Sequence, residues 1–274
     1  MSRISKRFQI CREAGRAALI PYITGGDPSP HKTVELMHGL VAGGADILEI
    51  GVPFSDPMAD GPVIQAACAR ALQAGTTPRD LFVAVEQFRR DDLETPVVFM
   101  GYANTLEAAG YQNYVEQAAA AGVDGLLTVD LPPDEAGGLT AIAAANGIEL
   151  IYLVAPNTTA QRLKHISSVA GGFIYAVALK GVTGAANLDT ALVERQVASI
   201  RQVSQLPVAV GFGVRDPQGA AAVARVADGV IVGSALVQMI ADHGEAADLA
   251  YHLRDAAAAL RRGMAVTAQT GGSL

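Results

Sequence analysis

Short apolar segments alternate with longer segments of helical periodicity along the whole chain. The apolar segments are rich in β-branched residues and are apolar at nearly every position, which is typical of parallel strands buried on both faces. We expect strands over residues 18–24, 46–51, 96–101, 124–130, 148–155, 172–178, 207–212 and 228–234. Apolar residues recur at helical spacing between them, in segments such as 34–44, 114–123, 139–147 and 191–203.

The number and spacing of these units predict the fold. About eight strand–helix units in 274 residues, with no linker-like segment, favour a closed (β/α)8 barrel, the TIM-barrel architecture. Residues 75–90 supply an extra helix before the third strand, and the pattern leaves room for further helices at the termini. A doubly wound open sheet is the alternative, but the even spacing favours closure. We expect a single domain over residues 1–274, with a frayed tail from about residue 264 to residue 274.

Composition narrows the possible partners and the compartment. The 20 Lys and Arg against 27 Asp and Glu give a net charge of −7, which argues against a broad nucleic-acid or anionic-membrane surface. No apolar run approaches the roughly 18 residues needed to cross a bilayer, and the N-terminus lacks a signal-peptide pattern. Cys11 and Cys68 are too few for a disulfide framework. We therefore expect a soluble, cytoplasmic protein that binds neither nucleic acid nor membrane.

Two carboxylates stand at the end of the second expected strand, in LEIGVPFSDPMADGP. Glu49 lies inside the apolar strand, where an ionised carboxylate without a partner costs several kcal/mol. It is either a structural ion-pair or outward-facing residue, or a general acid/base with a pKa raised by burial. Asp60 follows in a loop, where aspartates often form turns or cap helices. Active sites of such barrels form at the carboxyl ends of strands, so the two carboxylates can serve different proton transfers.

Glycines gather at the ends of the last three expected strands. Gly211 and Gly213 lie in one turn, Gly233 and Ser234 open the following helix, and Gly184 lies in the sixth loop. Tight turns also favour glycine, because it accepts positive φ. Glycines beside a helix N-terminus in the seventh and eighth loops form the phosphate site of many such barrels, however, and neither the dinucleotide nor the P-loop pattern is present. We interpret them as a site for a phosphate monoester held mainly by backbone amides.

Other kinds of site have little support. The five histidines form no H-x-x-x-H pattern and no pair with cysteine, so we expect no bound metal. No G-x-S-x-G elbow is present, which argues against a serine hydrolase. Several residues near strand ends either line an apolar pocket or belong to the plain barrel core. These residues are Tyr22, Met100, Tyr102, Leu127, Val129, Leu153 and Tyr175.

A series of motifs resembles the α subunit of tryptophan synthase. The motifs, in the order of that family, are LEIGVPFSDPMADGPVIQ, YANT, GVDGLLTVDLPPDE, GVTGA, VGFGVRDP and IVGSALV, over roughly residues 15–245. The PFSDPMADGP segment is very specific, whereas many phosphate-binding barrels share the glycine motifs. The resemblance implies a (β/α)8 barrel that cleaves indole-3-glycerol phosphate to indole and glyceraldehyde 3-phosphate without a cofactor of its own. It also implies a partner β subunit that contains pyridoxal phosphate, in an α2β2 complex with a tunnel for indole.

The resemblance further implies roles for individual residues. Glu49 matches the acid/base that protonates the indole ring carbon, Asp60 the carboxylate that stabilises the indolenine cation, and Tyr175 a tyrosine near Glu49. Thr183 matches a loop residue that meets Asp60 on closure. The positions that match the phosphate site are Gly184, Gly213, Gly233 and Ser234. Those that match the pocket wall or its supports are Tyr102, Leu127 and Asp130.

Two positions depart from the family pattern, and two other functions stay open. Tyr22 stands where phenylalanine is usual, so its hydroxyl needs a partner, and Ala178 stands where serine is common. One alternative is another phosphate-binding barrel lyase or isomerase, against which the PFSDPMADGP loop with Glu49 argues. The other is an allosteric or scaffolding subunit without activity, against which Glu49 and Asp60 argue. We expect the long loops after the second and sixth strands to close as lids.

Overall fold

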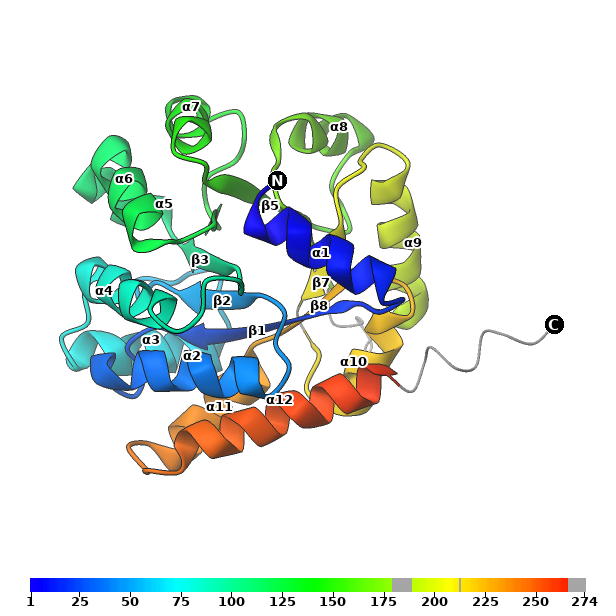
Figure 1. Ribbon diagram of the computed structural model, residues 1–274. Coiled ribbons are helices and arrows are strands. Elements are labelled where there is room, and N and C mark those ends of the chain that lie inside the picture. Colours follow the sequence, from blue (N-terminus) through cyan, green and yellow to red (C-terminus); the bar gives the residue numbers. More distant parts are fainter. Residues whose placement is uncertain (179–188, 212, 266–274) are drawn as a thin grey trace.

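The fold is a closed parallel barrel, in a computed structural model that describes residues 1–178, 189–211 and 213–265. Each strand pairs with the next in chain order, and β8 pairs with β1 (Figure 1). The strands are β1 (Ala18–Thr24), β2 (Leu48–Gly51), β3 (Val97–Gly101), β4 (Gly125–Thr128), β5 (Glu149–Val154), β6 (Ile174–Val177), β7 (Val208–Gly211) and β8 (Gly229–Val232). The expected (β/α)8 barrel is confirmed, and pairing of β8 with β1 excludes the open sheet.

Helices surround the barrel, and two of them, α3 and α4, lie between β2 and β3 as expected. The helices are α1 (Arg3–Glu13), η1 (Pro30–Lys32), α2 (Thr33–Ala42), α3 (Pro62–Gln73), α4 (Pro78–Arg89), α5 (Ala103–Ala109), α6 (Tyr111–Ala121), α7 (Gly137–Ala145), α8 (Ala160–Val169), α9 (Thr190–Arg201), α10 (Pro217–Ala224), α11 (Ser234–His243) and α12 (Leu249–Ala265). The short helix α5 was not expected; Gly110, with φ of +77°, separates it from α6. The expected tail begins inside α12, and its remainder lies outside the described residues.

Strand β1 shows why nearly every strand residue is apolar. Ala18, Ile20 and Tyr22 belong to the cluster inside the barrel, whereas Leu19 belongs to the cluster between the strands and the helices. Successive side chains of a strand point to opposite faces, and here both faces are covered. An ionisable side chain in such a strand, such as Glu49, is therefore buried on either face.

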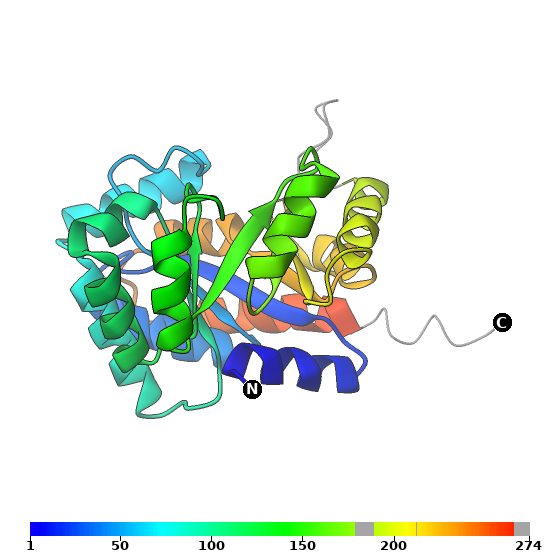
Figure 2. The ribbon, with the colours of Figure 1, turned by 90° about the horizontal axis from the view of Figure 1, so that it is seen from above.

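Helix α1 covers the N-terminal end of the barrel. Its Phe8 packs against Phe173, which precedes β6, with 5.6 Å between the ring centroids. Ile4 is fully buried in the interior cluster. Figure 2 shows α1, in dark blue, lying across this end of the barrel, below the strands in that view. The end at the carboxyl ends of the strands is therefore the one left for a substrate.

Three aspartates that were expected inside strands instead lie just before them. Asp46, Asp124 and Asp228 each accept a backbone N–H from a neighbouring strand, and each forms an ion pair with an arginine. The strands β2, β4 and β8 begin one or two residues later. These carboxylates need polar partners, so they stay at the strand starts rather than in the apolar barrel.

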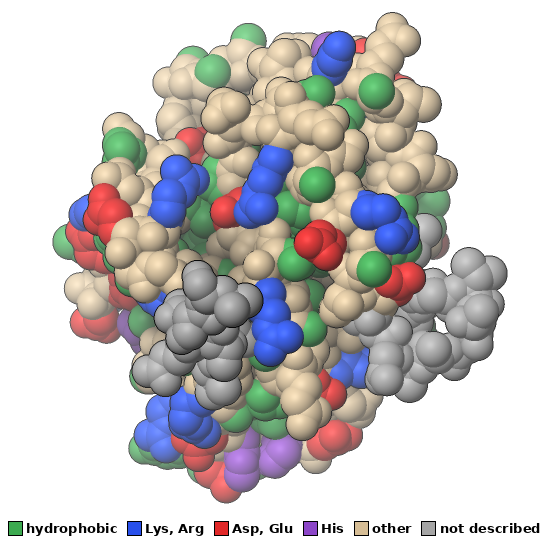
Figure 3. All heavy atoms as spheres, turned by 90° about the vertical axis from the view of Figure 1, so that its right-hand side faces the viewer, with side chains coloured by type: hydrophobic (Ala, Val, Ile, Leu, Met, Phe, Trp, Pro, Cys, Tyr) green, Lys and Arg blue, Asp and Glu red, His purple; other side chains and the backbone are tan. Residues whose placement is uncertain are grey.

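Charged side chains of both signs are spread over the surface near α9 and α10. Figure 3 shows Lys and Arg side chains separated by acidic, apolar and uncharged groups on this face. In the part of the chain that the structure describes, no helix is long and apolar enough to cross a membrane. On the described part of this face, the basic side chains therefore do not form one continuous patch.

Candidate active site

Glu49 is the second residue of β2, and its side chain lies inside the barrel. Its register partners are Tyr22 of β1 and Val98 of β3, which both belong to the interior cluster. The residue is 1% exposed, and neither carboxylate oxygen has a hydrogen-bond partner among the described residues. Burial, and then the negative charge of Asp60, raises the pKa of Glu49 to about 8. Glu49 is thus neither outward-facing nor ion-paired within the described chain, and it keeps its proton at neutral pH.

Asp60 lies at the end of the loop between β2 and α3. The hydroxyl of Tyr102 donates a hydrogen bond of 2.9 Å to Asp60 Oδ2 and accepts one of 3.1 Å from the Ala59 N–H. Burial raises the pKa of Asp60, and the Tyr102 hydrogen bond opposes that rise. The N-cap of α3 is Gly61, so Asp60 is not the helix cap.

The carboxyl groups of Glu49 and Asp60 differ in their burial and in their hydrogen-bond donors. Among the described residues Glu49 has no donor to stabilise a charge, and burial favours its neutral form. Asp60 accepts the Tyr102 hydroxyl, which favours its charged form. Asp60 therefore has a hydrogen-bond donor that Glu49 lacks among the described residues, and two carboxyl groups in such different surroundings can perform different roles in one reaction.

The apolar residues expected in the pocket line the same interior. Tyr22, Met100, Leu127 and Tyr175 are buried in the interior cluster, with Val129 and Leu153 packed against it. Burial, followed by the charge of Glu49, raises the pKa of Tyr175, so this tyrosine lies within electrostatic reach of Glu49. The extra hydroxyl of Tyr22 lies 3.3 Å from Thr24 Oγ1, which supplies the partner that a phenylalanine would not need.

The expected phosphate site lies partly within the described chain. Gly233 is the N-cap of α11 and Ser234 its first residue, and the first N–H groups of a helix have no intrahelical acceptor and attract anions. A Cβ on Gly233 would lie 3.3 Å from Tyr22 Cδ1, so this helix start faces the pocket wall. Gly213 is exposed after β7, with φ of +88°.

Three expectations fall wholly or partly on residues 179–188. Thr183, Gly184 and the lid after the sixth strand lie outside the described residues. Ala178, just before them, is buried in the cluster between strands and helices, and its N–H donates to the Gly211 carbonyl at 3.0 Å. This departure from the family pattern therefore lies on the outer face of the barrel wall.

Two residues that hold the site together were not singled out from the sequence. The Phe54 ring stacks on Tyr102, with 5.2 Å between centroids. Burial raises the pKa of the Cys68 thiol in α3, and the Phe54 backbone N–H opposes that rise, so this thiol lies near the Phe54 backbone. A loop phenylalanine carries no periodic signal, so only the fold reveals its contact.

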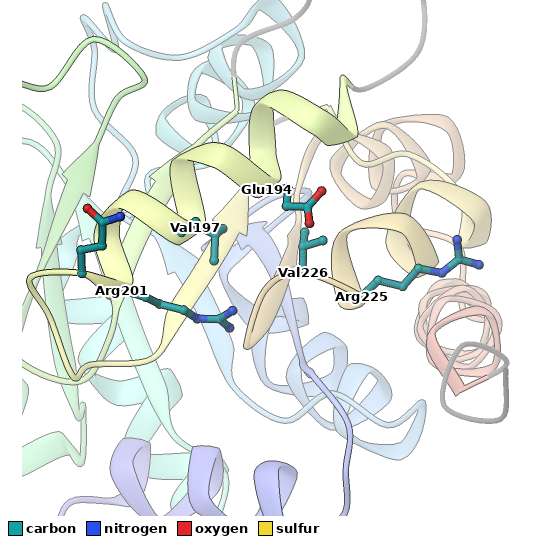
Figure 4. Close-up of a pocket in the computed structure, with 7 residues that line it drawn as sticks. Glu194, Val197, Arg201, Arg225 and Val226 are labelled. Carbon is teal, nitrogen blue, oxygen red and sulfur yellow. The ribbon is translucent and has the colours of Figure 1, made fainter. Parts of the chain in front are cut away.

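Two other kinds of site are alternatives for the functional site, a metal site and the hollow in Figure 4, and among the described residues neither lies at the carboxylate pair. In the described ranges, no group of three or more His, Cys, Asp or Glu side chains is placed to hold a metal ion. A hollow of about 450 Å³ lies between α9 and α10. The labelled residues that line it are Glu194, Val197, Arg201, Arg225 and Val226. Its two arginines precede β7 and β8, so the hollow lies toward the other end of the barrel from the carboxylate pair.

The chain is similar to known proteins over its whole length. The family model described as "Tryptophan synthase alpha chain" matches residues 8–268. The tryptophan synthase alpha chain of Halorhodospira halophila is 72% identical over 273 residues, with 100% of both chains covered. That of Alkalilimnicola ehrlichii is 61% identical over 241 residues, with 88% of each covered. A crystal structure of tryptophan synthase subunit alpha from Legionella pneumophila aligns with a TM-score of 0.90 at 43% identity, covering 97% of this chain and 99% of that one. This chain therefore belongs to the tryptophan synthase alpha chain family.

Proposed function

We propose that this chain cleaves indole-3-glycerol phosphate to indole and glyceraldehyde 3-phosphate with Glu49 and Asp60 as its catalytic pair. The cleavage is the reaction of tryptophan synthase alpha chains, lyases of tryptophan biosynthesis, and the chain matches that family over most of its length. One observation carries the assignment of the residues. Glu49 is a buried carboxyl group without a partner in the described chain, has a pKa of about 8, and lies within electrostatic reach of Asp60.

The reaction needs two proton transfers and one stabilised cation. A proton must reach the indole ring carbon that bears the glycerol chain, and a proton must leave the hydroxyl on the adjacent carbon. Glu49 donates its proton to the ring carbon, and its carboxylate then takes the hydroxyl proton as the carbon–carbon bond breaks. The electron pair of that bond restores the indole ring, and Glu49 ends protonated. Asp60 stabilises the intermediate indolenine cation at the ring N–H.

The remaining residues position the substrate. Tyr22, Met100, Leu127 and Tyr175 surround the indole ring, and Tyr102 holds Asp60. The phosphate binds backbone N–H groups at Gly213, Gly233 and Ser234, where the α11 dipole favours an anion. The proposed roles of Thr183 and Gly184 rest on the sequence motif alone.

The family name also implies a β-subunit partner. Alpha chains of this family hold no cofactor of their own. We propose an α2β2 complex in the cytoplasm, in which the β subunit holds pyridoxal phosphate and receives indole. The loop after β2 closes as a lid, and contact with the partner favours the closed state.

A cleavage assay with and without a β subunit tests this function. The chain alone should release indole slowly, and saturating β subunit, without its amino-acid substrate, should raise the rate. In both reactions a coupled dehydrogenase measures the glyceraldehyde 3-phosphate formed. For the chain alone, the fluorescence of the released indole can also be measured, because the sequence contains no Trp to give a background signal. No product in either reaction would favour a non-catalytic subunit, and a rate that the partner leaves unchanged would contradict the coupling.

Gly211→Ala should damage the pocket through Tyr175. A Cβ on Gly211 would lie 2.2 Å from Tyr175 Oη and 2.6 Å from two ring carbons, so the ring must move. We expect kcat/KM for cleavage to fall about 10- to 100-fold, since small displacements of site residues have effects of that size. The matched control is Gly138→Ala in α7, where an added Cβ meets nothing within 4 Å. Equal activities of the two variants would contradict a tight fit around Tyr175.

A further inference from the structure

Two hydrogen bonds connect the loops that follow β2, β3 and β4. Tyr102, after β3, donates through its hydroxyl to Asp60 Oδ2 at 2.9 Å. The next residue, Ala103, is the first of α5, and its N–H donates to Asp130 Oδ1 at 2.7 Å. Asp130 lies exposed in the loop after β4. These two hydrogen bonds therefore connect the Asp130 carboxylate, outside the pocket, to the Asp60 carboxylate inside it, through the adjacent residues Ala103 and Tyr102.

Helix α5 depends on Asp130 at its N-terminus. Tyr102 is the N-cap of this helix and makes no side-chain cap hydrogen bond. Asp130 supplies from a neighbouring loop both an acceptor for the first N–H and a negative charge, which the helix dipole favours. Because α5 has only 7 residues, few hydrogen bonds of its own fix where it begins.

The position of Tyr102 decides how well its hydroxyl serves Asp60. The ring stacks on Phe54, and the hydroxyl lies between the Ala59 N–H and Asp60. The ring is rigid, so a shift of the backbone at the start of α5 moves the hydroxyl by a similar amount. Hydrogen bonds weaken steeply as their geometry departs from the ideal.

We propose that Asp130 is a positioning residue for the cleavage reaction, which fixes the start of α5 and so places the Tyr102 hydroxyl that donates to Asp60. The role rests on the proposed function of Asp60. Asp130 acts only through Tyr102. Replacing Asp130 therefore weakens the hydrogen bond from the Tyr102 hydroxyl to Asp60, and Tyr102→Phe removes that same bond altogether.

The pH dependence of kcat/KM for indole release by the full chain tests this role. Asp130→Ala should lower kcat/KM about 3- to 10-fold, the effect of weakening one hydrogen bond to a charged group. The Tyr102 donor lowers the pKa of Asp60, so its weakening raises that pKa, and the acidic limb of the profile should move to higher pH. Asp130→Asn keeps an acceptor oxygen and should recover most of the activity. The control Asp134→Ala removes a carboxylate of the same loop that pairs with His165 at 3.1 Å, and should leave the profile unchanged.

A double variant separates positioning from a general structural effect. Tyr102→Phe combined with Asp130→Ala should have the kcat/KM of Tyr102→Phe alone, because the two residues act through one hydrogen bond. Additive losses, or a loss in Asp130→Ala without a shift of the acidic limb, would overturn the proposal. If Asp130→Ala does not fold, Asp130→Asn serves as the test. Its acidic limb should move to higher pH by less than is expected for Asp130→Ala. A pH profile of Asp130→Asn identical to that of the wild-type chain would overturn the positioning role of Asp130. A wild-type chain that releases no indole would refute the proposed function itself, and this role with it.

Discussion

Glu49→Gln is expected to abolish indole formation while the chain stays folded. Glutamine has nearly the same shape, but it neither donates an acidic proton to the ring carbon nor accepts the hydroxyl proton. Loss of one positioned acid/base group lowers rates by about 10²–10⁴-fold, and here one group serves both proton transfers. Indole release by the purified variant measures the effect, with circular dichroism as the control for folding. Near-normal turnover would overturn the role of Glu49.

The same substitution should remove a pH dependence of stability. The pKa of Glu49 is about 8 in the folded chain against an ordinary value of 4.5. Below pH 4.5 the Glu49 carboxyl group is protonated in both the folded and the unfolded chain. Between pH 4.5 and about 8 only the folded chain holds this proton, so the free energy of unfolding falls as pH rises. Above about pH 8 neither state holds it, and the free energy of unfolding stays low. The decrease is on the order of a few kcal/mol.

Urea unfolding at several pH values measures this effect. The midpoint of the wild-type chain should fall between about pH 5 and about pH 9 relative to that of Glu49→Gln, because only the wild-type chain has the buried carboxyl group of Glu49 to ionise. The comparison between the two chains cancels the titration of the groups that do not interact with Glu49. Parallel midpoints across this range would show that Glu49 titrates normally in the folded state.

Asp60→Asn should lower cleavage by about 10²–10⁴-fold, because a neutral amide cannot balance the charge of the indolenine cation. The charge of Asp60 also raises the pKa of Glu49, so this variant should bring that pKa down. Steady-state kinetics of indole release and the pH dependence of unfolding measure the two effects.

Asp56→Asn is the matched control for this variant. Asp56 lies in the same loop but is exposed, and within the described part of the chain its carboxylate accepts a hydrogen bond only from the Ser55 hydroxyl, at 2.5 Å. The chain alone should keep its activity when Asp56 is neutral. Equal rates for Asp56→Asn and Asp60→Asn would make Asp60 an ordinary turn residue.

Most of the barrel was predictable because its strands are buried on both faces. Residues 18–24 were predicted as a strand, and β1 covers the same residues. Errors arose where a polar residue ended an apolar run. The fourth strand was expected over residues 124–130, but β4 ends at Thr128. Asp130 consequently lies in a loop, from which its carboxylate reaches the start of α5.

The sequence by itself determined the barrel, the family and the place of Glu49 and Asp60 at the end of the second strand. Those features depend on local periodicity and on motifs whose residues are neighbours along the chain. Only the tertiary structure decided that Glu49 faces the interior without a partner in the described chain, and that Tyr102 holds Asp60. Asp60 and Tyr102 are 42 residues apart, and Ala103 and Asp130 are 27 apart. Closure of the parallel barrel brings such residues together, because it gathers the carboxyl ends of all its strands at one end.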